Sequence, residues 1–203
     1  MRTGLALLAA LAAAACASHD RPALDSTTLR YDRAPHGHLD VPLLGDFQDD
    51  RRQLADLVRI LCERGTDEGV VPYRAVCTLE EFFTGLRSTG AFAANVFDGP
   101  VPRERPDLWF QRLAAIRGHA GVTDVLVWNI ELEPFEGGVI LDWPYSDSVL
   151  VYTTLPDSEL AELFEELRPS EIMAARKDHL EDLQHSGFPE PSDGERLAWV
   201  WWD

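Results

Sequence analysis

The chain has 203 residues, of which 45% are hydrophobic and 9% aromatic, which is enough apolar side chain for one globular domain with an appended segment. It carries 35 acidic and 18 basic residues, giving a formal net charge of -17 at pH 7. Nucleic-acid affinity rests mainly on Lys and Arg that neutralise phosphates, so this charge argues against nucleic-acid binding. Acidity of this degree would attract a basic protein partner or a cation, but it is also a common solubility device, which is the favoured interpretation.

The first eighteen residues have the layout of a secretory signal. Arg2 gives a short positive start, an uncharged stretch runs from residue 5 to residue 15, and small residues surround Cys16. A membrane-spanning helix takes about 20 apolar residues, and this stretch is shorter. We therefore predict that residues 1–18 are a signal segment that directs export.

Residues 11–16 resemble the lipobox of bacterial lipoproteins, in which the cysteine is acylated and becomes the new N-terminus, although Ala13 stands where leucine is usual. The resemblance is confined to the N-terminus. It implies lipidation at Cys16 and a membrane anchor in the cell envelope, on the periplasmic or extracellular face. Ordinary signal cleavage after Ala17 would instead give a secreted soluble protein, and an alanine-rich cytoplasmic helix is a third interpretation.

Residues 19–44 contain three prolines and no sustained periodicity, so they are predicted to be a tether or an irregular N-terminal arm. One folded domain follows over residues 45–203. His36 and His38 form the most metal-like cluster, because imidazoles beside carboxylates can hold a transition metal. Nothing in a tether would fix their geometry, so solvated side chains are the favoured interpretation and no cofactor is predicted.

Helices and strands can be predicted in chain order from the spacing of apolar residues. A first helix is expected from Asp46 to about Gly65, and a second, short one from Thr78 to about residue 86, with Thr78 as its cap. A short strand is expected over 91–95. A third helix is predicted to start at Pro106 and to stop at Gly118.

In the second half of the domain, apolar and polar residues alternate along the sequence, which is typical of strands. The clearest strand is 125–132, and it is expected to place four apolar residues on one face, Leu126, Trp128, Ile130 and Leu132. Further strands are expected over 139–143 and 148–155, and helical segments from residue 156 and over about 170–183. The last strand, 197–202, is apolar on both faces, which suits a central place in a sheet or an interface.

Short turns join the middle strands, and helices and strands are partly segregated along the chain. These features predict an α+β domain, with an antiparallel or mixed sheet of about four to five strands and three to five helices packed on it.

Two cysteines lie in the predicted domain, Cys62 at the end of a helix and Cys77 before the next one. If the chain is exported, they can pair as a disulfide. The alternative is two buried thiols, because cysteine is among the most buried residue types.

Carboxylates and aromatic residues gather in the sequence between residues 131 and 147. Glu131, Asp142 and Asp147 are candidate acid–base residues, and Trp143 and Tyr145 beside them are candidate binding residues. The alternative is ordinary turn chemistry, in which Asp and Ser flank proline for local hydrogen bonds.

Three tryptophans close the chain and are candidates for a recognition surface, since tryptophan is enriched at binding hot spots. Alternation places Trp199 and Trp201 on one face of the last strand and Trp202 on the other, and at least one of these faces is expected to be core.

The favoured function is an exported, lipid-anchored, acidic protein-binding module, immunity-like or accessory to the envelope, with a basic protein as its partner. The alternative is a small cell-envelope hydrolase that uses the carboxylates near the 143–147 turn. No phosphate loop, dinucleotide fingerprint or hydrolase signature is present, and no motif in residues 19–203 is specific enough to name a family.

Overall fold

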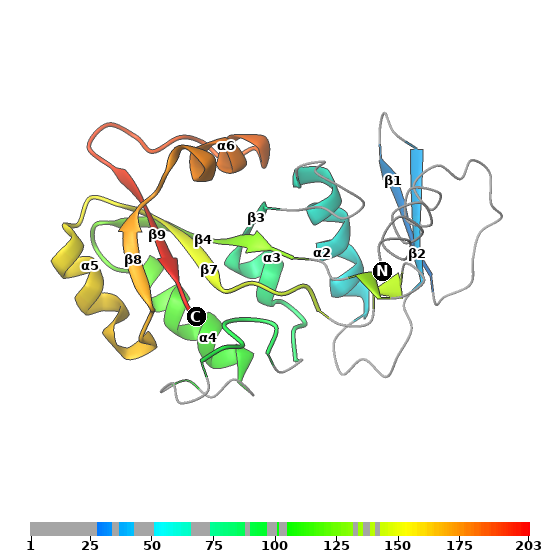
Figure 1. Cartoon of the computed structure of the whole chain (residues 1–203), viewed down its shortest axis with the longest axis horizontal. Coiled ribbons are helices and arrows are strands. Elements are labelled where there is room, and N and C mark those ends of the chain that lie inside the picture. Colours follow the sequence, from blue (N-terminus) through cyan, green and yellow to red (C-terminus); the bar gives the residue numbers. More distant parts are fainter. Residues whose placement is uncertain are drawn as a thin grey trace, which may run out of the picture.

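A computed structural model describes residues 28–33, 37–42, 51–65, 74–87, 90–96, 101, 105–131, 134–135, 139–140 and 143–203 (Figure 1). Its helices are α2 (Arg51–Arg64), α3 (Leu79–Phe83), α4 (Pro106–Arg117), α5 (Asp157–Phe164) and α6 (Lys177–His185), with a 3-10 turn η1 at Glu165–Leu167. Its strands are β1 (Thr28–Arg33), β2 (Gly37–Pro42), β3 (Ala75–Thr78), β4 (Val122–Ile130), β5 (Pro134–Phe135), β6 (Val139–Ile140), β7 (Ser148–Thr153), β8 (Glu171–Ala174) and β9 (Arg196–Trp201).

Five of the strands form one sheet in the order β3-β4-β7-β9-β8, and every neighbouring pair in it is antiparallel. The strands β1 and β2 pair with each other, as do β5 and β6. The predicted α+β class is therefore confirmed. The last strand, β9, lies between β7 and β8, so of the two interpretations of its apolar faces the structure has the central place in the sheet.

Buried side chains divide between the two faces of this sheet. On one face, Val125 and Val149 belong to a large cluster with residues of α2, α3, α4 and α5. On the other face, Leu126 and Leu150 pack in a smaller cluster with Leu183 of α6. Fully burying a side chain of this size contributes about 1.5–3 kcal/mol, so both layers stabilise the sheet, and α6 is the helix that covers the second face.

Strand β4 departs from the predicted alternation at Asn129. Leu126 and Trp128 lie on the α6 face as predicted, whereas Ile130 is buried in the cluster on the opposite face. Asn129 has a φ of 55°, and the register of β3 against β4 shifts close to it. A bulge of this kind reverses the faces of the residues that follow, so the prediction for Ile130 is wrong, and Leu132 lies outside the described residues.

Residues 170–183 do not form the single helical segment that was predicted. Residues Glu171–Ala174 are β8, and α6 begins only at Lys177. Pairing with β9 decides the conformation of this short segment, since tertiary contacts override weak local preference in strands. The strand expected over 91–95 is reduced to one bridge between Phe92 and Ser146.

The β1–β2 hairpin falls inside residues 19–44, the predicted tether or irregular arm. Its register pairs Asp32 with His38. This part of the segment is thus regular structure, while Cys16 and His36 lie outside the described residues, as does the side chain of His38. Within the described ranges, no helix combines the length and apolar character that crossing a membrane requires.

Candidate functional site

The clearest surface feature is a pair of tryptophans on β9. Trp199 and Trp201 are partly exposed on the α6 side of the sheet, and their rings stack with centroids 5.9 Å apart and planes inclined by 24°. In the register of the sheet, Met173 lies directly opposite Trp199, and Glu171 lies opposite Trp201. Directly opposite residues share a face, so these four residues form one patch, called here the tryptophan surface.

A buried polar cluster lies between α6 and the sheet, next to the tryptophan surface. The indole of Trp128 donates to the carboxylate of Asp182 at 3.1 Å. The ring of His179, which is completely buried, lies 4.4 Å from that of Trp128 and 5.0 Å from that of Trp199. The guanidinium of Arg176 lies over the ring of Trp199, 5.4 Å from its centroid, as in a cation–π contact.

The protonation of His179 follows from its hydrogen bond. The backbone N–H of Arg176 donates to Nδ1 of His179 at 3.0 Å, so the proton of the neutral ring is on Nε2. That Nε2 and the Nε1 of Trp199 are both buried and have no hydrogen-bond partner among the described residues. Burial, followed by the charges of Arg176 and Arg74, lowers the pKa of His179 to about 4, against an opposing effect of Asp178. The ring is therefore neutral at physiological pH.

Burial also acts on the carboxylate of this cluster. It raises the pKa of Asp182, which the hydrogen bond from Trp128 and the charge of Arg74 partly offset. Both ionisable groups beneath the tryptophan surface are therefore shifted towards their neutral forms, as expected for groups removed from water.

Two of the candidate catalytic carboxylates meet at Tyr145. The backbone of Glu131 pairs with that of Tyr145, and the Tyr145 hydroxyl donates to Asp147 at 3.3 Å. Burial, together with the nearby carboxylates of Asp147, Glu131 and Asp203, raises the pKa of Tyr145 above its ordinary range. The arrangement is acidic and aromatic, which suits a cation, and Asp142 lies outside the described residues.

Two tryptophans proposed as binding residues belong to the core. Trp143 is buried and donates to the carbonyl of Phe82 at 3.0 Å. Trp202 is completely buried and donates to the carbonyl of Leu167 at 2.8 Å. The indoles of Trp143 and Trp202 are bonded inside the domain, as the expected core face of the last strand is, so Trp199 and Trp201 are the candidates that reach the surface.

Of the two alternatives for the cysteines, the structure has the buried thiols and not the disulfide. Cys62 in α2 and Cys77 in β3 are both buried as thiols in the large hydrophobic cluster. Burial raises the pKa of the Cys77 thiol far above its ordinary value, and Glu81 adds to this effect. A thiol in such surroundings behaves as a small apolar side chain, so the alternative interpretation replaces the disulfide.

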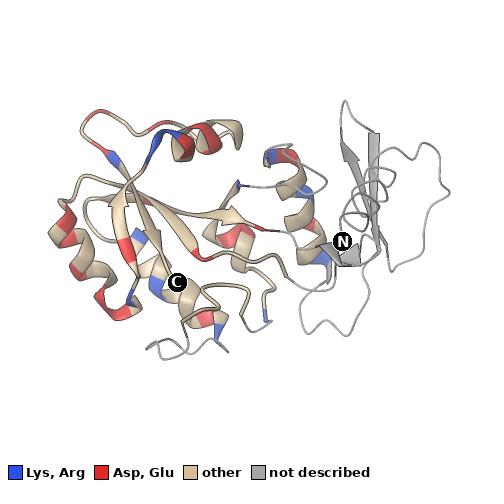
Figure 2. Cartoon of the chain, in the orientation of Figure 1, with Lys and Arg blue, Asp and Glu red and all other residues tan. Residues whose placement is uncertain are grey.

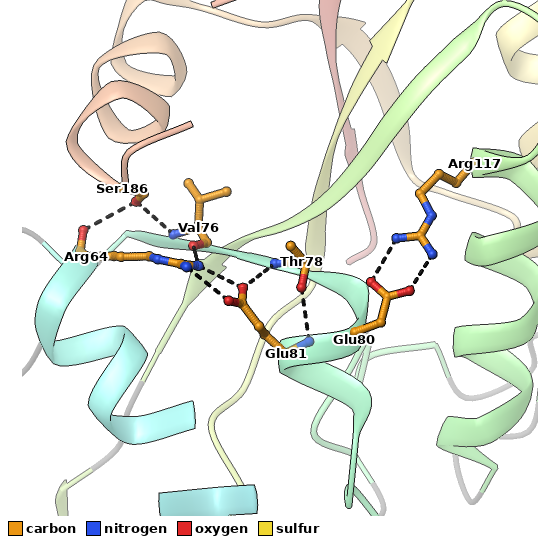
Figure 3. A network of polar contacts seen from close by, with 7 residues as sticks. All are labelled: Arg64, Val76, Thr78, Glu80, Glu81, Arg117 and Ser186. Carbon is orange, nitrogen blue, oxygen red and sulfur yellow. Dashed lines mark hydrogen bonds and ion pairs between the residues drawn. The ribbon is translucent and has the colours of Figure 1, made fainter. Parts of the chain in front are cut away.

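Side chains from three helices close the outer edge of β3 (Figure 3). Arg64 of α2 donates to both oxygens of the Glu81 carboxylate, at 2.7 and 2.9 Å, and to the carbonyl of Val76 at 3.3 Å. Ser186, at the end of α6, accepts from the backbone N–H of Val76 at 3.1 Å. Glu81 also accepts from the N–H of Thr78 at 2.8 Å, and this completes the predicted cap of α3.

The charges of this network compensate one another. Burial alone would raise the pKa of Glu81, but the hydrogen bonds from Arg64 and Thr78 outweigh it, and the pKa is lowered. A second ion pair, between Arg117 of α4 and Glu80 of α3, lies next to the network (Figure 3). The backbone of the β3 edge is thus bonded by two ionised side chains, Arg64 and Glu81, and by the hydroxyl of Ser186.

The opposite edge of the sheet, β8, is built differently. It is the outer strand beside β9, and no other strand in the described part of the chain pairs with it. Glu171 and Ala174 are exposed, and Ile172 and Met173 are partly buried. Figure 1 shows β8 at the side of the sheet away from α2, next to α5.

Two small cavities in the described parts of the molecule lie away from these residues. One of about 190 Å³ lies between α4 and the end of α5, and one of about 140 Å³ lies beside Tyr152 and the 188–195 loop. Neither is lined by Glu131, Asp147 or the tryptophan surface. Among the described residues, no group of three or more His, Cys, Asp and Glu side chains is arranged to hold a metal ion.

Several residues of these sites were not identified from the sequence. His179 and Asp182 lie in a helix rich in charged residues, where a solvated position is the ordinary expectation. Arg64 and Ser186 act on β3 over separations of 12 and 110 residues, which no local pattern reveals. The one available signal was the spacing of Thr78 and Glu81, which predicts the cap but not the pairing with Arg64.

Comparison with known proteins places residues 52–200 in a family. They match the family model described as "Uncharacterized protein YfbO family". The chain is 33% identical over 131 residues to the uncharacterized protein YfbO of Escherichia coli (strain K12), an alignment that covers 64% of this chain and 84% of that protein. No solved structure matches the chain. The match supplies the family that no single motif could name: the chain belongs to the YfbO family.

Proposed function

We propose that the protein is an acidic protein-binding module that takes a positively charged segment of a partner on the tryptophan surface. The observation that carries the proposal is the partly exposed stack of Trp199 and Trp201, in which one ring already holds a cation, the guanidinium of Arg176. A Lys or Arg of a partner can make the same contact with Trp201, worth about 0.5–2 kcal/mol.

The charges around the tryptophan surface favour a cation. Glu171 is exposed directly opposite Trp201, and Asp203 follows the same strand and is exposed. The raised pKa of Tyr145, caused in part by Asp147, Glu131 and Asp203, reports a negative potential at this end of the sheet. Figure 2 shows further acidic residues along α5, beyond the sheet. Such a field steers basic partners and repels acidic ones.

The proposal includes export and anchoring in the cell envelope through a lipid on Cys16. Its support is the signal-like layout of residues 1–18, with small residues around the cysteine. Mass spectrometry of the protein extracted from membranes tests this part. A mature chain that starts at an acylated Cys16 is expected, and an unprocessed chain from the soluble fraction would contradict it.

Binding to lysine-rich and glutamate-rich peptides of equal length tests the interaction. We expect the lysine peptide to bind in a salt-sensitive way and Trp201→Ala to weaken it about tenfold, because the ring is removed and the carboxylates remain. Glu171→Lys should weaken it similarly. Asp56→Lys, at an exposed position of α2 beside the other edge of the sheet, is the matched control for charge and should have little effect.

Two outcomes would count against the proposal. Equal affinity for the lysine and glutamate peptides would show that charge does not select the partner. An equal loss for Asp56→Lys and Glu171→Lys would show that the acidity acts over the whole molecule and not at the tryptophan surface.

A further inference from the structure

The open edge of β8 suggests how the partner is held. We propose that the basic segment binds as an extended strand added to β8, beside the tryptophan surface. This inference rests on the proposed function and adds the mode of binding to it. Strand addition to a sheet edge supplies affinity through main-chain hydrogen bonds and specificity through alternate side chains.

Hydrogen bonding within the sheet shows which groups of β8 are directed outward. The N–H of Ala175 donates to the carbonyl of Leu197 in β9 at 2.9 Å. Bonded and non-bonded pairs alternate along an antiparallel ladder, so Met173 and Glu171 also bond towards β9. The N–H and C=O groups of Ile172 and Ala174 then point away from β9, along the edge.

Bonding of β9 on its other side agrees with this alternation. The N–H of Trp202 donates to the carbonyl of Asp147, so Val200 and Ala198 bond towards β7. Because these residues lie opposite Ile172 and Ala174, the outward direction of the two β8 residues follows independently.

The edge of β8 has few of the features that usually block strand addition. Natural edges are commonly protected by lysine, proline, bulges or covering side chains. At β3, Arg64, Glu81 and Ser186 bond the outward backbone groups. The segment Glu171–Ala174 contains no lysine or proline, its pairing with β9 is regular, and Ala174 is exposed with a small side chain.

Charge complementarity selects the occupant. Side chains of an added strand alternate between the two faces of the sheet, and those on the α6 face lie next to Glu171. On the opposite face, α5 packs near β8. Four exposed carboxylates lie on α5 or just after it: Glu159, Glu162, Glu165 and Glu166. A segment with Lys or Arg at alternate positions fits both the edge and its surroundings. A second copy of this chain would bring its own Glu171 to the same edge.

A proline at position 174 tests strand addition without removing a bond to β9. Proline lacks the N–H that points outward here, and it is tolerated at edge positions of this kind. The probe is a short peptide that alternates lysine with threonine, titrated against the full chain. We expect Ala174→Pro to weaken binding about tenfold and Ala174→Val, the control, to change it less than about twofold. Melting temperatures of both variants should stay close to that of the parent.

Peptides methylated on alternate backbone nitrogens give the same test with the unaltered protein. The test therefore remains possible if Ala174→Pro does not fold. Methylation in the register that bonds to β8 should abolish binding, and methylation in the other register should not. Equal binding of both methylated peptides would overturn the inference.

The outcomes separate this inference from the proposed function. If Trp201→Ala weakens peptide binding but Ala174→Pro and methylation do not, the partner lies on the tryptophan surface without adding a strand, and only this inference is wrong. If none of these changes affects binding, both are wrong. If sedimentation shows a dimer that Ala174→Pro dissociates, a second copy occupies the edge, and the inference is overturned.

Discussion

The two edges of the five-stranded sheet meet their surroundings in different ways. At β3, the N–H and C=O groups of Val76 are bonded by Ser186 and Arg64. At β8, the corresponding groups of Ile172 and Ala174 point away from the sheet. An edge whose groups are bonded within the domain contributes to stability and offers little to a partner, whereas an unpaired edge is a template for another chain. We therefore expect changes at β3 to alter folding and changes at β8 to alter binding.

Removing Arg64 should have the largest effect on stability at neutral pH. In Arg64→Met, the carboxylate of Glu81, 24% exposed, loses its ion pair, so we expect a loss of about 2–3 kcal/mol of unfolding free energy, measured in urea. Arg59→Met is the matched control, because its pair with Glu63 is about half exposed and should contribute less than about 0.5 kcal/mol. Equal losses in the two variants would show that β3 is not held by this network.

Acid should lower the stability of the domain through α6. This helix contains His179 and Asp182, which lie beneath the tryptophan surface, and it ends at Ser186. The folded pKa of His179, about 4, lies below its ordinary value of 6.5, so the unfolded chain takes up the proton first as the pH falls. Burial of the neutral His179 therefore costs no folding free energy above about pH 6.5. As the pH falls to about 4, the free energy of unfolding drops by about 3 kcal/mol. His179→Phe should lack this part of the pH dependence. Parallel stability curves for the variant and the parent would contradict the buried neutral histidine.

Ser186→Ala should have a smaller effect, confined to the closed edge. It removes the acceptor of the buried Val76 N–H, and we expect a loss of about 1–2 kcal/mol in urea unfolding. Binding of the lysine peptide should be unchanged. Ser158→Ala, at an exposed position in α5, serves as the control and should be close to neutral. A loss of peptide binding in Ser186→Ala would show that the two edges are coupled.

Features that depend on neighbouring residues were predictable from the sequence. The cap at Thr78, the helix start at Pro106 and the alternation of Trp199, Trp201 and Trp202 follow from short-range spacing, and the structure has all of them. The central position of β9 followed from its being apolar on both faces.

Features set by distant contacts were not predictable. A single residue, Asn129, shifts the faces of β4, and the pairing with β9 makes a strand of residues 171–174. The sequence could not decide between a disulfide and two thiols, because spacing along the chain does not orient two side chains, and Cys62 and Cys77 are both buried as thiols. The pairing of Arg64 with Glu81 depends on how α2 packs against β3, which only the fold determines.

Amide hydrogen exchange, resolved by NMR, tests the contrast between the two edges most directly and needs no partner. The amides of Val76 and Thr78 are bonded to Ser186 and Glu81, so they should exchange slowly, close to the rate set by global unfolding. The amides of Ile172 and Ala174 should exchange quickly, while that of Ala175, bonded to Leu197, should be protected. Slow exchange at Ile172 and Ala174 would contradict the account, because it would show that the β8 edge is already closed.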